Sequence, residues 1–360
     1  MSAPIDQLAT DQQWMQRALA LAARGQYTTR PNPAVGCVIV KDGVCVGEGF
    51  HPKAGEPHAE VFALRQAGEQ ARGATAYVTL EPCAHFGRTP PCANALVQAG
   101  VARVVMAILD TNPQVSGKGR AILETAGIAT TVGVCEAEAR ALNAGFLQVM
   151  AGGRPYVRLK VGASLDGRTA MASGESKWIT SPAARADVQH MRAISGTIIT
   201  GIDTVLSDDP LLNVRSTPDG TPLELIPQPL RVVLDRQGRM PATAQMLQQP
   251  ESVLLVGASA VDGVETWSTT DLAALLIRLR DEKNIRDVLI EAGATLSAAF
   301  LQAGLVDELI VYVAPTLLGQ SARPMFGLAF EQLSEQLRFE WIDVTPVGAD
   351  LRLRLRPIRE

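Results

Sequence analysis

Two features that would point to a membrane or a nucleic-acid partner are missing from this sequence of 360 residues. No stretch of about 18 uncharged apolar residues occurs, and residues 1–10 lack the basic and then apolar pattern of a secretory signal. Basic residues are not in excess: the formal net charge is −4 and the pI is about 5.7, whereas nucleic-acid binding usually needs an extended basic surface. We therefore expect a cytoplasmic protein that acts on a small molecule and binds neither nucleic acid nor membrane.

Cysteine is also scarce, and its five occurrences are an odd number. Two of them, Cys83 and Cys92, belong to a metal-binding pattern described below. The other three, Cys37, Cys45 and Cys135, lie in apolar surroundings, so we expect them to be reduced and buried.

The length of the chain predicts two domains rather than one. The apolar fraction of 47%, with 19% charged residues, is enough material for two hydrophobic cores. The segment Ala151–Pro155 contains two glycines and a proline, which is typical of a linker. We therefore predict domains at residues 1–150 and 155–360. Helical and strand patterns alternate along the first, which predicts an α/β fold with helices on both faces of a sheet, and the second is a further α/β unit.

Hydrophobic periodicity and turn residues locate the elements of the first domain. Thr10 is expected to cap a helix that ends at Gly25, and Asp42–Gly43 is expected to join two strands, 35–40 and 44–47, as a hairpin turn. Further strands are expected at 76–80, 103–108 and 128–132, and further helices at 58–71, 92–99, 119–126 and 136–150.

The second domain has the same kinds of signal. Thr180–Pro182 predicts the start of a helix, because a capping residue is followed by proline at the first helical position. Residues 218–229 are rich in proline and predict a surface loop. Strands are expected at 156–161, 196–200, 231–234, 252–256, 288–290 and 308–313, and helices at 271–280 and 296–304.

One constellation in the first domain carries specific chemistry. His58 is followed by Glu60, and the cysteines Cys83 and Cys92 come later, each directly after a proline. One imidazole and two thiolates can hold a zinc ion and leave its fourth position for water, with Glu60 close enough to move protons. The pattern matches the signature of zinc-dependent deaminases and predicts hydrolytic removal of an amine from a nucleobase-like ring, with Glu60 as the catalytic residue.

The alternative is a closed structural zinc site or a pair of plain buried cysteines. A closed site needs a fourth protein ligand, for which His51 and His85 are the only nearby candidates. In that case Glu60 would have no task. The spacing of the cysteines differs from the usual signature, because residues 84–91 separate them instead of two residues. We expect this insertion to arch over the site and to contact substrate.

The version of the pattern found here resembles a known family. The segments Glu81–Cys92, Asn32–Gly36 and His51–Gly55 are similar to motifs in the deaminase half of the bifunctional riboflavin-biosynthesis deaminase/reductase. The resemblance implies a cytidine-deaminase-like α/β/α sandwich for the first domain. It also implies that Asn32, His51 and His85 contact the pyrimidine or its substituents, and that Arg88 helps to bind the ribosyl phosphate.

The second domain lacks the glycine fingerprint of a Rossmann fold. Residues 290–296 instead read as a strand, a glycine turn and a helix, which could place backbone N–H groups against a phosphate, although such a turn is more often structural. The segments Lys160–Arg168, Ser173–Thr180, Thr204–Arg215 and Glu291–Leu296 resemble motifs of the family's reductase half, whose fold is similar to that of dihydrofolate reductase.

This second resemblance implies two sets of binding residues. The residues implied to hold NADPH are Ala163, Trp178, Thr204, Asp208, Gly293, Ala294, Thr295, Leu296, Ser297, Ala298 and Ala299. The residues implied to hold the substrate are Ser176, Arg192, Leu212, Arg215 and Glu291. Two arginines suit a ribosyl phosphate, which is a dianion; Arg185 and Arg192 share a helix face, so one of them could be merely solvated.

These observations predict a bifunctional enzyme of riboflavin biosynthesis that uses Zn²⁺ and NADPH. It would deaminate 2,5-diamino-6-ribosylamino-4(3H)-pyrimidinone 5′-phosphate and then reduce the ribosyl side chain, giving 5-amino-6-ribitylamino-uracil 5′-phosphate. The family also implies a homo-oligomer, either a dimer or a tetramer. Alternatives are a nucleoside or tRNA deaminase with an accessory pterin-type reductase domain, and a zinc-stabilised binding module without catalytic activity.

Overall fold

The computed structural model describes residues 7–84, 91–113, 115–258, 260–269 and 271–359. The chain forms two compact units, residues 1–153 and 154–360, and each is described here by itself. Within the described residues, no helix is both long enough and apolar enough to cross a membrane.

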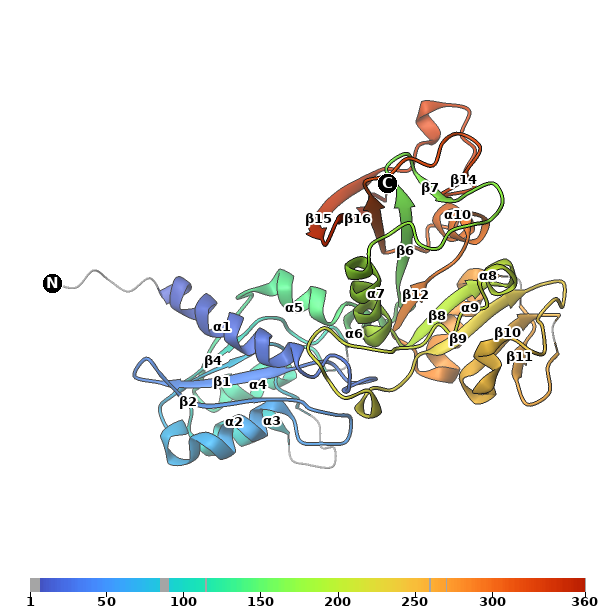
Figure 1. The fold of residues 1–360 in the computed structure, drawn as a ribbon. Coiled ribbons are helices and arrows are strands. Elements are labelled where there is room, and N and C mark those ends of the chain that lie inside the picture. The colour runs from blue at the N-terminus through green and yellow to red at the C-terminus, as the bar shows by residue number, and fades with distance from the viewer. Residues whose placement is uncertain (1–6, 85–90, 114, 259, 270, 360) are drawn as a thin grey trace. The chain divides into compact units, whose positions relative to one another are not determined.

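The first unit is a five-stranded sheet with helices on both faces (Figure 1). The strand order is β2-β1-β3-β4-β5; β1 is antiparallel to β2 and β3, and the last three strands are parallel to one another. Its strands are β1 (Gly36–Lys41), β2 (Val44–Phe50), β3 (Thr75–Val78), β4 (Arg103–Met106) and β5 (Ala129–Val132). Its helices are α1 (Gln7–Ala23), α2 (Ala59–Ala67), α3 (Cys92–Ala99), α4 (Lys118–Thr125), α5 (Glu136–Leu142) and α6 (Ala144–Met150).

Two hydrophobic clusters show which helices cover which face. One cluster joins α2, α3 and α4 to one face of the sheet, and the other joins α1, α5 and α6 to the opposite face. Figure 1 shows α1 and α5 on one side of the sheet and α2 and α3 on the other. This confirms the predicted α/β/α sandwich.

Glycines in the sheet let the helices pack closely. A Cβ atom at Gly36 would lie 1.9 Å from the backbone oxygen of Ala18 in α1, and one at Gly47 would lie 2.2 Å from that of Ala63 in α2. Any larger residue at these positions would therefore push a helix away from the sheet.

The hairpin prediction is confirmed, and two helix predictions are wrong in detail. Asp42 and Gly43 both have positive φ, 52° and 76°, as a two-residue hairpin turn between β1 and β2 requires. The first helix begins at Gln7, so Thr10 lies inside it. The helix expected at 136–150 is divided into α5 and α6 at Asn143.

Asn143 ends α5 because its side chain bonds to a distant part of the backbone. Its Oδ1 accepts a hydrogen bond from the Ala34 amide, and its Nδ2 donates to the Ala34 carbonyl, both at 2.8 Å. The side chain of Asn143 pairs with a buried backbone segment, and the backbone conformation that Asn143 adopts to do so does not continue the helix.

The second unit contains a nine-stranded sheet of order β11-β10-β9-β8-β12-β6-β13-β16-β15 and a small two-stranded sheet, β14-β7. The large sheet is parallel except for β16 and β15, which are antiparallel to their neighbours. The strands are β6 (Tyr156–Ser164), β7 (Arg168–Ala170), β8 (Thr197–Gly201), β9 (Leu230–Asp235), β10 (Val253–Gly257), β11 (Glu265–Trp267), β12 (Asp287–Ile290), β13 (Glu308–Ala314), β14 (Arg323–Pro324), β15 (Phe339–Val347) and β16 (Asp350–Pro357).

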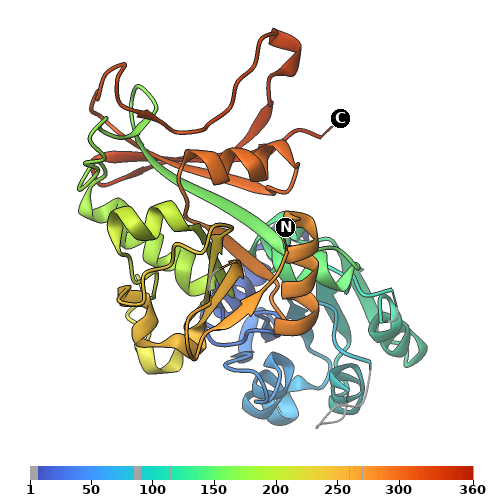
Figure 2. The same ribbon diagram turned by 90° about the vertical axis from the view of Figure 1, so that its right-hand side faces the viewer.

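Helices cover both faces of this sheet as well. They are α7 (Pro182–Ile194), α8 (Ile202–Asp208), α9 (Leu272–Lys283) and α10 (Ala294–Gln302). One hydrophobic cluster includes α7 and α8, and the other includes α9 and α10. In Figure 2 the yellow-green helices and the orange helices lie on opposite sides of the long strand β6. The second unit is therefore also α/β, as predicted.

The sequence analysis missed β15 and β16. Their sequences alternate apolar and polar residues, as in Leu351, Arg352, Leu353 and Arg354, which is the period of a strand with two different faces.

A buried carboxylate ties α1 to the sheet of the first unit. Asp11 accepts two hydrogen bonds from the Arg103 guanidinium, at 2.8 and 2.7 Å, and one each from Tyr77 and Gln7, both at 2.9 Å. Burial alone would raise the pKa of Asp11, but the hydrogen bonds from Arg103, Gln7 and Tyr77 outweigh it and lower the pKa below 3.8.

Asp11→Asn is expected to lower the free energy of unfolding by about 2–3 kcal/mol at neutral pH, because Arg103 loses a charged acceptor. A carboxyl group with a lowered folded-state pKa stabilises the fold at pH values above its unfolded-state pKa. The difference in free energy of unfolding between Asp11→Asn and wild type should therefore narrow as the pH falls below about 4. Urea denaturation at several pH values, with hydrogen exchange of Gln7–Ala23, measures this. Asp42→Asn in the exposed hairpin turn is the control, and an equal loss in the control would contradict the prediction.

Candidate functional site

Three predicted metal ligands come together in the first unit. His58 directly precedes α2, Cys92 is the first residue of α3, and Cys83 lies in the segment after β3. The Nδ1 atom of His58 is 3.6 Å from the Cys83 sulfur and 3.4 Å from the Cys92 sulfur, and all three donor atoms lie within 4.8 Å of one another.

These distances fit a zinc ion. With zinc–sulfur bonds of about 2.3 Å and zinc–nitrogen bonds of about 2.0–2.1 Å, a tetrahedral site places nitrogen and sulfur about 3.6 Å apart. In the part of the chain that the structure describes, the potential metal ligands that meet here are these three alone, which leaves a fourth position for a non-protein ligand.

The arrangement of His51 argues against a closed site that uses it as fourth ligand. Its Nδ1 is 3.1 Å from the Pro57 carbonyl, and its Nε2 is 3.3 Å from Nδ2 of Asn32. Since the carbonyl can only accept, Nδ1 carries the proton and Nε2 accepts from Asn32. Burial lowers the pKa of His51, which agrees with this neutral form. The other candidate fourth ligand, His85, lies outside the described residues, as does Arg88.

Local hydrogen bonds favour the thiolate form of Cys83. The Cys92 amide, at the first turn of α3, lies 3.3 Å from the Cys83 sulfur. Hydrogen bonds from the Cys92 side chain, from His58 and from this amide outweigh burial and hold the pKa of the Cys83 thiol well below its usual value. The shared hydrogen bond with Cys83, together with burial, raises the pKa of Cys92.

Glu60 is the buried carboxyl group beside this cluster. It is the second residue of α2 and only 3% exposed, and its Oε2 has no hydrogen-bond partner among the described residues. Burial, with the nearby charge of Cys83, raises the pKa of Glu60 to about 7. A buried carboxylate oxygen without a protein partner fits a site that water or substrate completes.

Asn32 and His51 also belong to this part of the unit. Asn32 follows α1 and His51 follows β2, and their side chains contact each other. The His51 and His58 rings are 5.4 Å apart in an edge-to-face arrangement. The structure therefore brings His51 next to the metal ligand His58 and places Asn32 against His51.

The second unit has a buried cluster of charges at Glu291, which directly follows β12. Both carboxylate oxygens of Glu291 bind the Arg192 guanidinium, at 2.6 and 3.0 Å, and Lys160 of β6 places its Nζ 3.9 Å from Oε2. Burial would raise the pKa of Glu291, but Arg192 and Lys160 lower it. Burial lowers the pKa of Lys160 despite the attraction of Glu291. The sequence analysis did not identify Lys160 as a site residue. A lysine inside a largely apolar strand is the pattern that could have indicated it.

Arg215 lies in the loop after α8 and is connected to this cluster through Asn213. Its guanidinium donates to Oδ1 of Asn213 at 3.1 Å, and the Asn213 carbonyl accepts a hydrogen bond from Arg192 at 3.2 Å. Leu212, in the same loop, is buried and has a positive φ of 48°. Ser176 lies in the loop before α7, and among the residues that the structure describes no hydrogen bond or ion pair joins it to the cluster.

Arg185 and Arg192 differ in their surroundings. Arg192 is buried and paired with Glu291, whereas the Arg185 guanidinium lies 4.4 Å from the ring centre of Trp178 and donates to the Thr180 carbonyl at 2.6 Å. Neither arginine is therefore merely solvated.

Apart from Trp178, the residues implied to hold the cofactor lie at or after the carboxyl ends of adjacent parallel strands. Ala163 is near the end of β6, Thr204 and Asp208 are on α8 directly after β8, and residues 293–299 follow β12. Because β8, β12 and β6 are neighbours, these ends meet at one edge of the sheet, where open α/β sheets bind ligands. A Cβ atom at Gly293 would have nothing within 4 Å, which leaves space for a ligand at the start of α10.

The later residues of this turn face inward. Ser297 and Ala298 are buried, and the Ser297 hydroxyl donates to the Ala292 carbonyl at 3.3 Å. Gly293 and Thr295, in contrast, are exposed and therefore accessible to a ligand.

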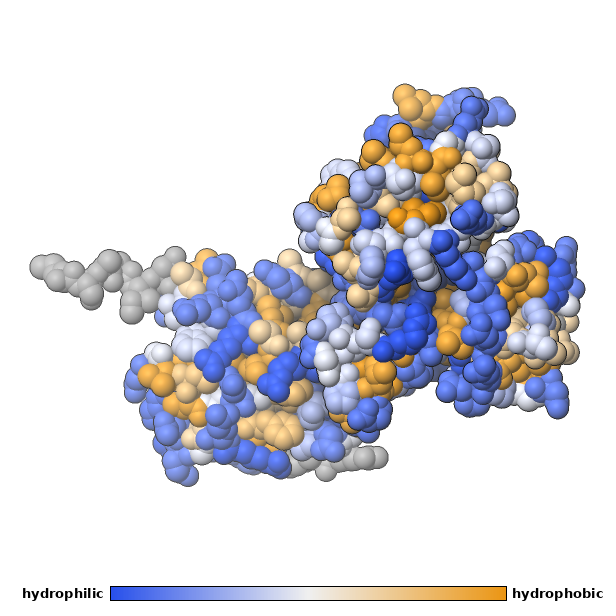
Figure 3. All heavy atoms as spheres, in the orientation of Figure 1, coloured by the Kyte–Doolittle hydropathy of each residue, from blue (hydrophilic) through white to orange (hydrophobic). Residues whose placement is uncertain are grey.

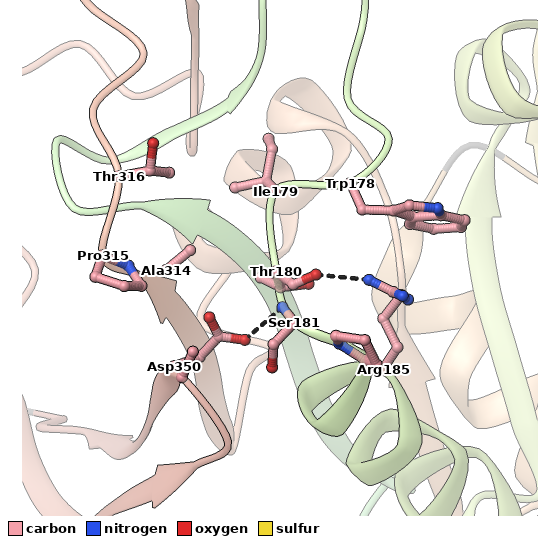
Figure 4. Close-up of a pocket in the computed structure, with 11 residues that line it drawn as sticks. Trp178, Ile179, Thr180, Ser181, Arg185, Ala314, Pro315, Thr316 and Asp350 are labelled. Atoms are coloured by element: carbon pink, nitrogen blue, oxygen red, sulfur yellow. Dashed lines mark hydrogen bonds between the residues drawn. The ribbon is translucent and has the colours of Figure 1, made fainter.

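Trp178 lines a pocket of about 500 Å³ at the start of α7 (Figure 4). Asp350 accepts a hydrogen bond from the Ser181 amide at 2.7 Å on the opposite wall. Of the residues implied to hold NADPH, Trp178 alone lines this pocket. The full lining is Trp178, Ile179, Thr180, Ser181, Pro182, Arg185, Ala314, Pro315, Thr316, Ala349 and Asp350.

Comparison with protein families assigns the two units separately. Residues 8–108 match the family described as the cytidine and deoxycytidylate deaminase zinc-binding region. Residues 155–353 match the family described as the RibD C-terminal domain.

Comparison with individual proteins extends over nearly the whole chain. The riboflavin biosynthesis protein RibD of Escherichia coli is 52% identical, over 96% of this chain and 99% of its own length. A solved structure of Acinetobacter baumannii RibD is 62% identical, with a TM-score of 0.93, and covers 98% of this chain and 100% of its own. A Thermotoga maritima structure, named as a diaminohydroxyphosphoribosylaminopyrimidine deaminase/5-amino-6-(5-phosphoribosylamino)uracil reductase, is 34% identical, with a TM-score of 0.88 and coverage of 98% and 100%. The predicted resemblance is confirmed: the chain belongs to the family of the riboflavin biosynthesis protein RibD.

Proposed function

We propose that this protein catalyses two consecutive steps of riboflavin biosynthesis. A zinc-dependent deaminase domain, residues 1–150, removes the amine of 2,5-diamino-6-ribosylamino-4(3H)-pyrimidinone 5′-phosphate. An NADPH-dependent reductase domain, residues 155–360, then reduces the ribosyl side chain to give 5-amino-6-ribitylamino-uracil 5′-phosphate. The observation that carries the proposal is the group of His58, Cys83 and Cys92 with the buried carboxyl of Glu60 beside it. The name of the Thermotoga maritima relative, a deaminase and reductase of these compounds, supports the same two reactions.

In the deaminase domain, His58, Cys83 and Cys92 would hold the zinc ion. Zinc, when bound, supplies a Lewis acid that activates water for attack on C2 of the pyrimidine. Glu60 accepts a proton at its carboxylate and returns one to the departing amine. Asn32 and His51 bind the polar edge of the ring, with His85 and Arg88 as further substrate contacts. The Pro57 carbonyl and Asn32 hold the His51 ring in one orientation.

In the reductase domain, NADPH would be held by Ala163, Trp178, Thr204, Asp208 and residues 293–299. NADPH, when bound, supplies the hydride that reduces C1′ of the opened sugar. The chain itself positions the two partners and excludes water. The positive end of α10 suits a cofactor phosphate.

The substrate of the second step would lie against Ser176, Arg192, Leu212, Arg215 and Glu291. Arg192 is already neutralised by Glu291, so Arg215, whose guanidinium is held here by the neutral Asn213, is the better candidate for direct contact with the dianionic phosphate. Glu291 then orients Arg192 and Lys160 at the wall of the site.

The cytoplasm is the compartment that this chemistry favours. All five cysteines lie in the described part of the chain and are free thiols. Two of them must stay reduced to bind a metal, which suits a reducing compartment.

We also propose that the protein is a homo-oligomer that uses the sheet face of β15 and β16. Register pairs place Trp341 opposite Leu355 and Val344 opposite Leu353 on one face. Trp341 is 64% exposed and Val344 is 52% exposed, and Figure 3 shows hydrophobic side chains on the surface of this part of the molecule. β15 is also the edge strand of the sheet.

The charges of β15 and β16 lie on the other face and already have partners. Arg352 binds Asp187 and Asp343, and Arg354 binds Glu308. A second copy of this chain fits the apolar face as its partner. A two-fold axis brings the same surface of both copies together, and an uncharged surface can meet itself without electrostatic repulsion.

The paired activity test separates the two domains. Removal of the metal with a chelator is expected to abolish ammonia release from the diaminopyrimidine substrate, because the deaminase depends on the ion. NADPH oxidation with deaminated substrate should continue, since the metal ligands His58, Cys83 and Cys92 all lie in the deaminase domain. Cytidine and an RNA stem-loop are the control substrates, and turnover of either at a comparable rate would favour the alternative deaminase instead.

A pair of matched substitutions tests the assigned residues. Glu60→Gln is expected to reduce ammonia release by about 10²-fold or more, because the proton acceptor is lost, and to leave NADPH oxidation unchanged. Glu291→Gln should reduce NADPH oxidation and leave ammonia release unchanged, because Arg192 and Lys160 lose their carboxylate partner. Assays of both half-reactions in both variants measure this. Equal losses of both activities in either variant would contradict the assignment.

The oligomer proposal predicts that a charge on the apolar face separates the copies. Trp341→Glu is expected to shift the sedimentation coefficient of the protein to that of a monomer, because two like charges would meet at the two-fold axis. Val44→Glu, in the exposed hairpin of the first unit, is the control. A monomeric wild-type protein, or an oligomer that survives the Trp341 change, would contradict the prediction.

A further inference from the structure

Glu81 has no part in the chemistry described above, yet its carboxylate accepts three backbone hydrogen bonds close to the metal site. It stands two residues before Cys83 and is 6% exposed. Its Oε2 accepts hydrogen bonds from the backbone amides of Asp110 at 3.1 Å and Gly117 at 3.0 Å, and its Oε1 accepts one from the backbone amide of Arg120 at 3.0 Å. We propose that Glu81 is a positioning residue that holds Cys83 in place for the metal and thereby sets the metal affinity of the first unit.

The partners of Glu81 belong to the start of α4 and to the loop before it. Gly117 precedes α4, and Arg120 is in its first turn, where amides have no partner within the helix. A carboxylate there satisfies these amides and is favoured by the helix dipole. Gly119 allows the close approach, because a Cβ atom at this position would lie 2.0 Å from the Pro82 carbonyl.

Cys83 needs such a support more than the other two ligands do. His58 lies at the start of α2 and Cys92 at the start of α3, so the packing of these helices fixes both. Cys83 lies in an irregular segment. Its carbonyl accepts a hydrogen bond from the Ala93 amide at 3.2 Å, and its sulfur receives one from the Cys92 amide.

The link between Glu81 and Cys83 is short and stiff. Only Pro82 separates them, and its ring fixes its φ angle. The Glu81 amide also donates to the Ile108 carbonyl at 3.0 Å, so both the backbone and the side chain of Glu81 are fixed to neighbouring elements. The Cys83 sulfur is thus held from the α3 side by Cys92 and from the α4 side through Glu81.

Glu81→Gln changes this support with almost no change in shape. Both carboxylate oxygens accept from backbone N–H groups, so the new amide nitrogen must face at least one donor in either orientation. Zinc affinity is expected to fall by about 10-fold or more, as for other groups that orient metal ligands. Glu124→Gln is the matched control, because it makes the same change on the exposed side of α4.

The experiment uses the full chain without its metal and needs no turnover. Zn²⁺ is titrated against a competing chelator of known affinity, and Co²⁺ absorption reports the thiolate geometry. Glu81→Gln should show weaker Zn²⁺ binding and an altered Co²⁺ spectrum, and Glu124→Gln should match wild type. Glu81→Asp keeps the charge and is one methylene shorter, so its Zn²⁺ affinity should lie between those of Glu81→Gln and wild type. It replaces the glutamine variant in the experiment if that variant does not fold.

The outcomes separate this inference from the proposed function on which it rests. Wild-type affinity and spectrum in both Glu81 variants would overturn the positioning role alone. A variant that only unfolds more easily, with unchanged affinity once folded, would overturn it as well. Failure of the wild-type protein to bind Zn²⁺ would overturn the proposed metal site itself. NADPH oxidation with deaminated substrate checks in each variant that the second unit is intact.

Discussion

The close packing of α2 and α3 against one face of the first sheet is the constraint on which the metal site depends. Small residues make it possible: Cβ atoms at Gly47 and Gly49 would lie 2.2 and 2.7 Å from the backbone oxygens of Ala63 and Ala59. The shared hydrophobic cluster places the first turns of both helices side by side. His58 and Cys92 therefore meet although 34 positions separate them, and their positive helix ends favour a thiolate and a negative ligand nearby.

The third ligand shows how irregular segments acquire precision. Cys83 is held through hydrogen bonds to the starts of two helices, one directly and one through Glu81. Each bond uses an amide that a helix leaves unsatisfied, so the same groups complete the helices and orient the thiolate. The stability of the sandwich and the geometry of the metal site are thus properties of the same contacts.

The second unit brings its chemistry together by a different route. Parallel strands β6, β8 and β12 end at one edge, and their following segments supply Thr204, Glu291 and Gly293. The charges there are mostly paired: Arg192 and Lys160 share Glu291. A buried cluster of this kind is costly to break, since removing one member leaves the others uncompensated. Both sites therefore lie where backbone elements end and where polar groups remain available.

The sequence by itself determined the family, the α/β class of both units, the hairpin at Asp42–Gly43, the helix at 92–99 and the types of metal ligand. These follow from local patterns: turn residues with positive φ, apolar periodicity and donor atoms of the right softness. Tertiary structure decided the rest. Asn143 divides a continuous helical pattern because it bonds to Ala34, 109 positions away. Lys160 and Glu81 acquire their roles from neighbours that only strand pairing and helix packing bring near, which a local pattern cannot encode.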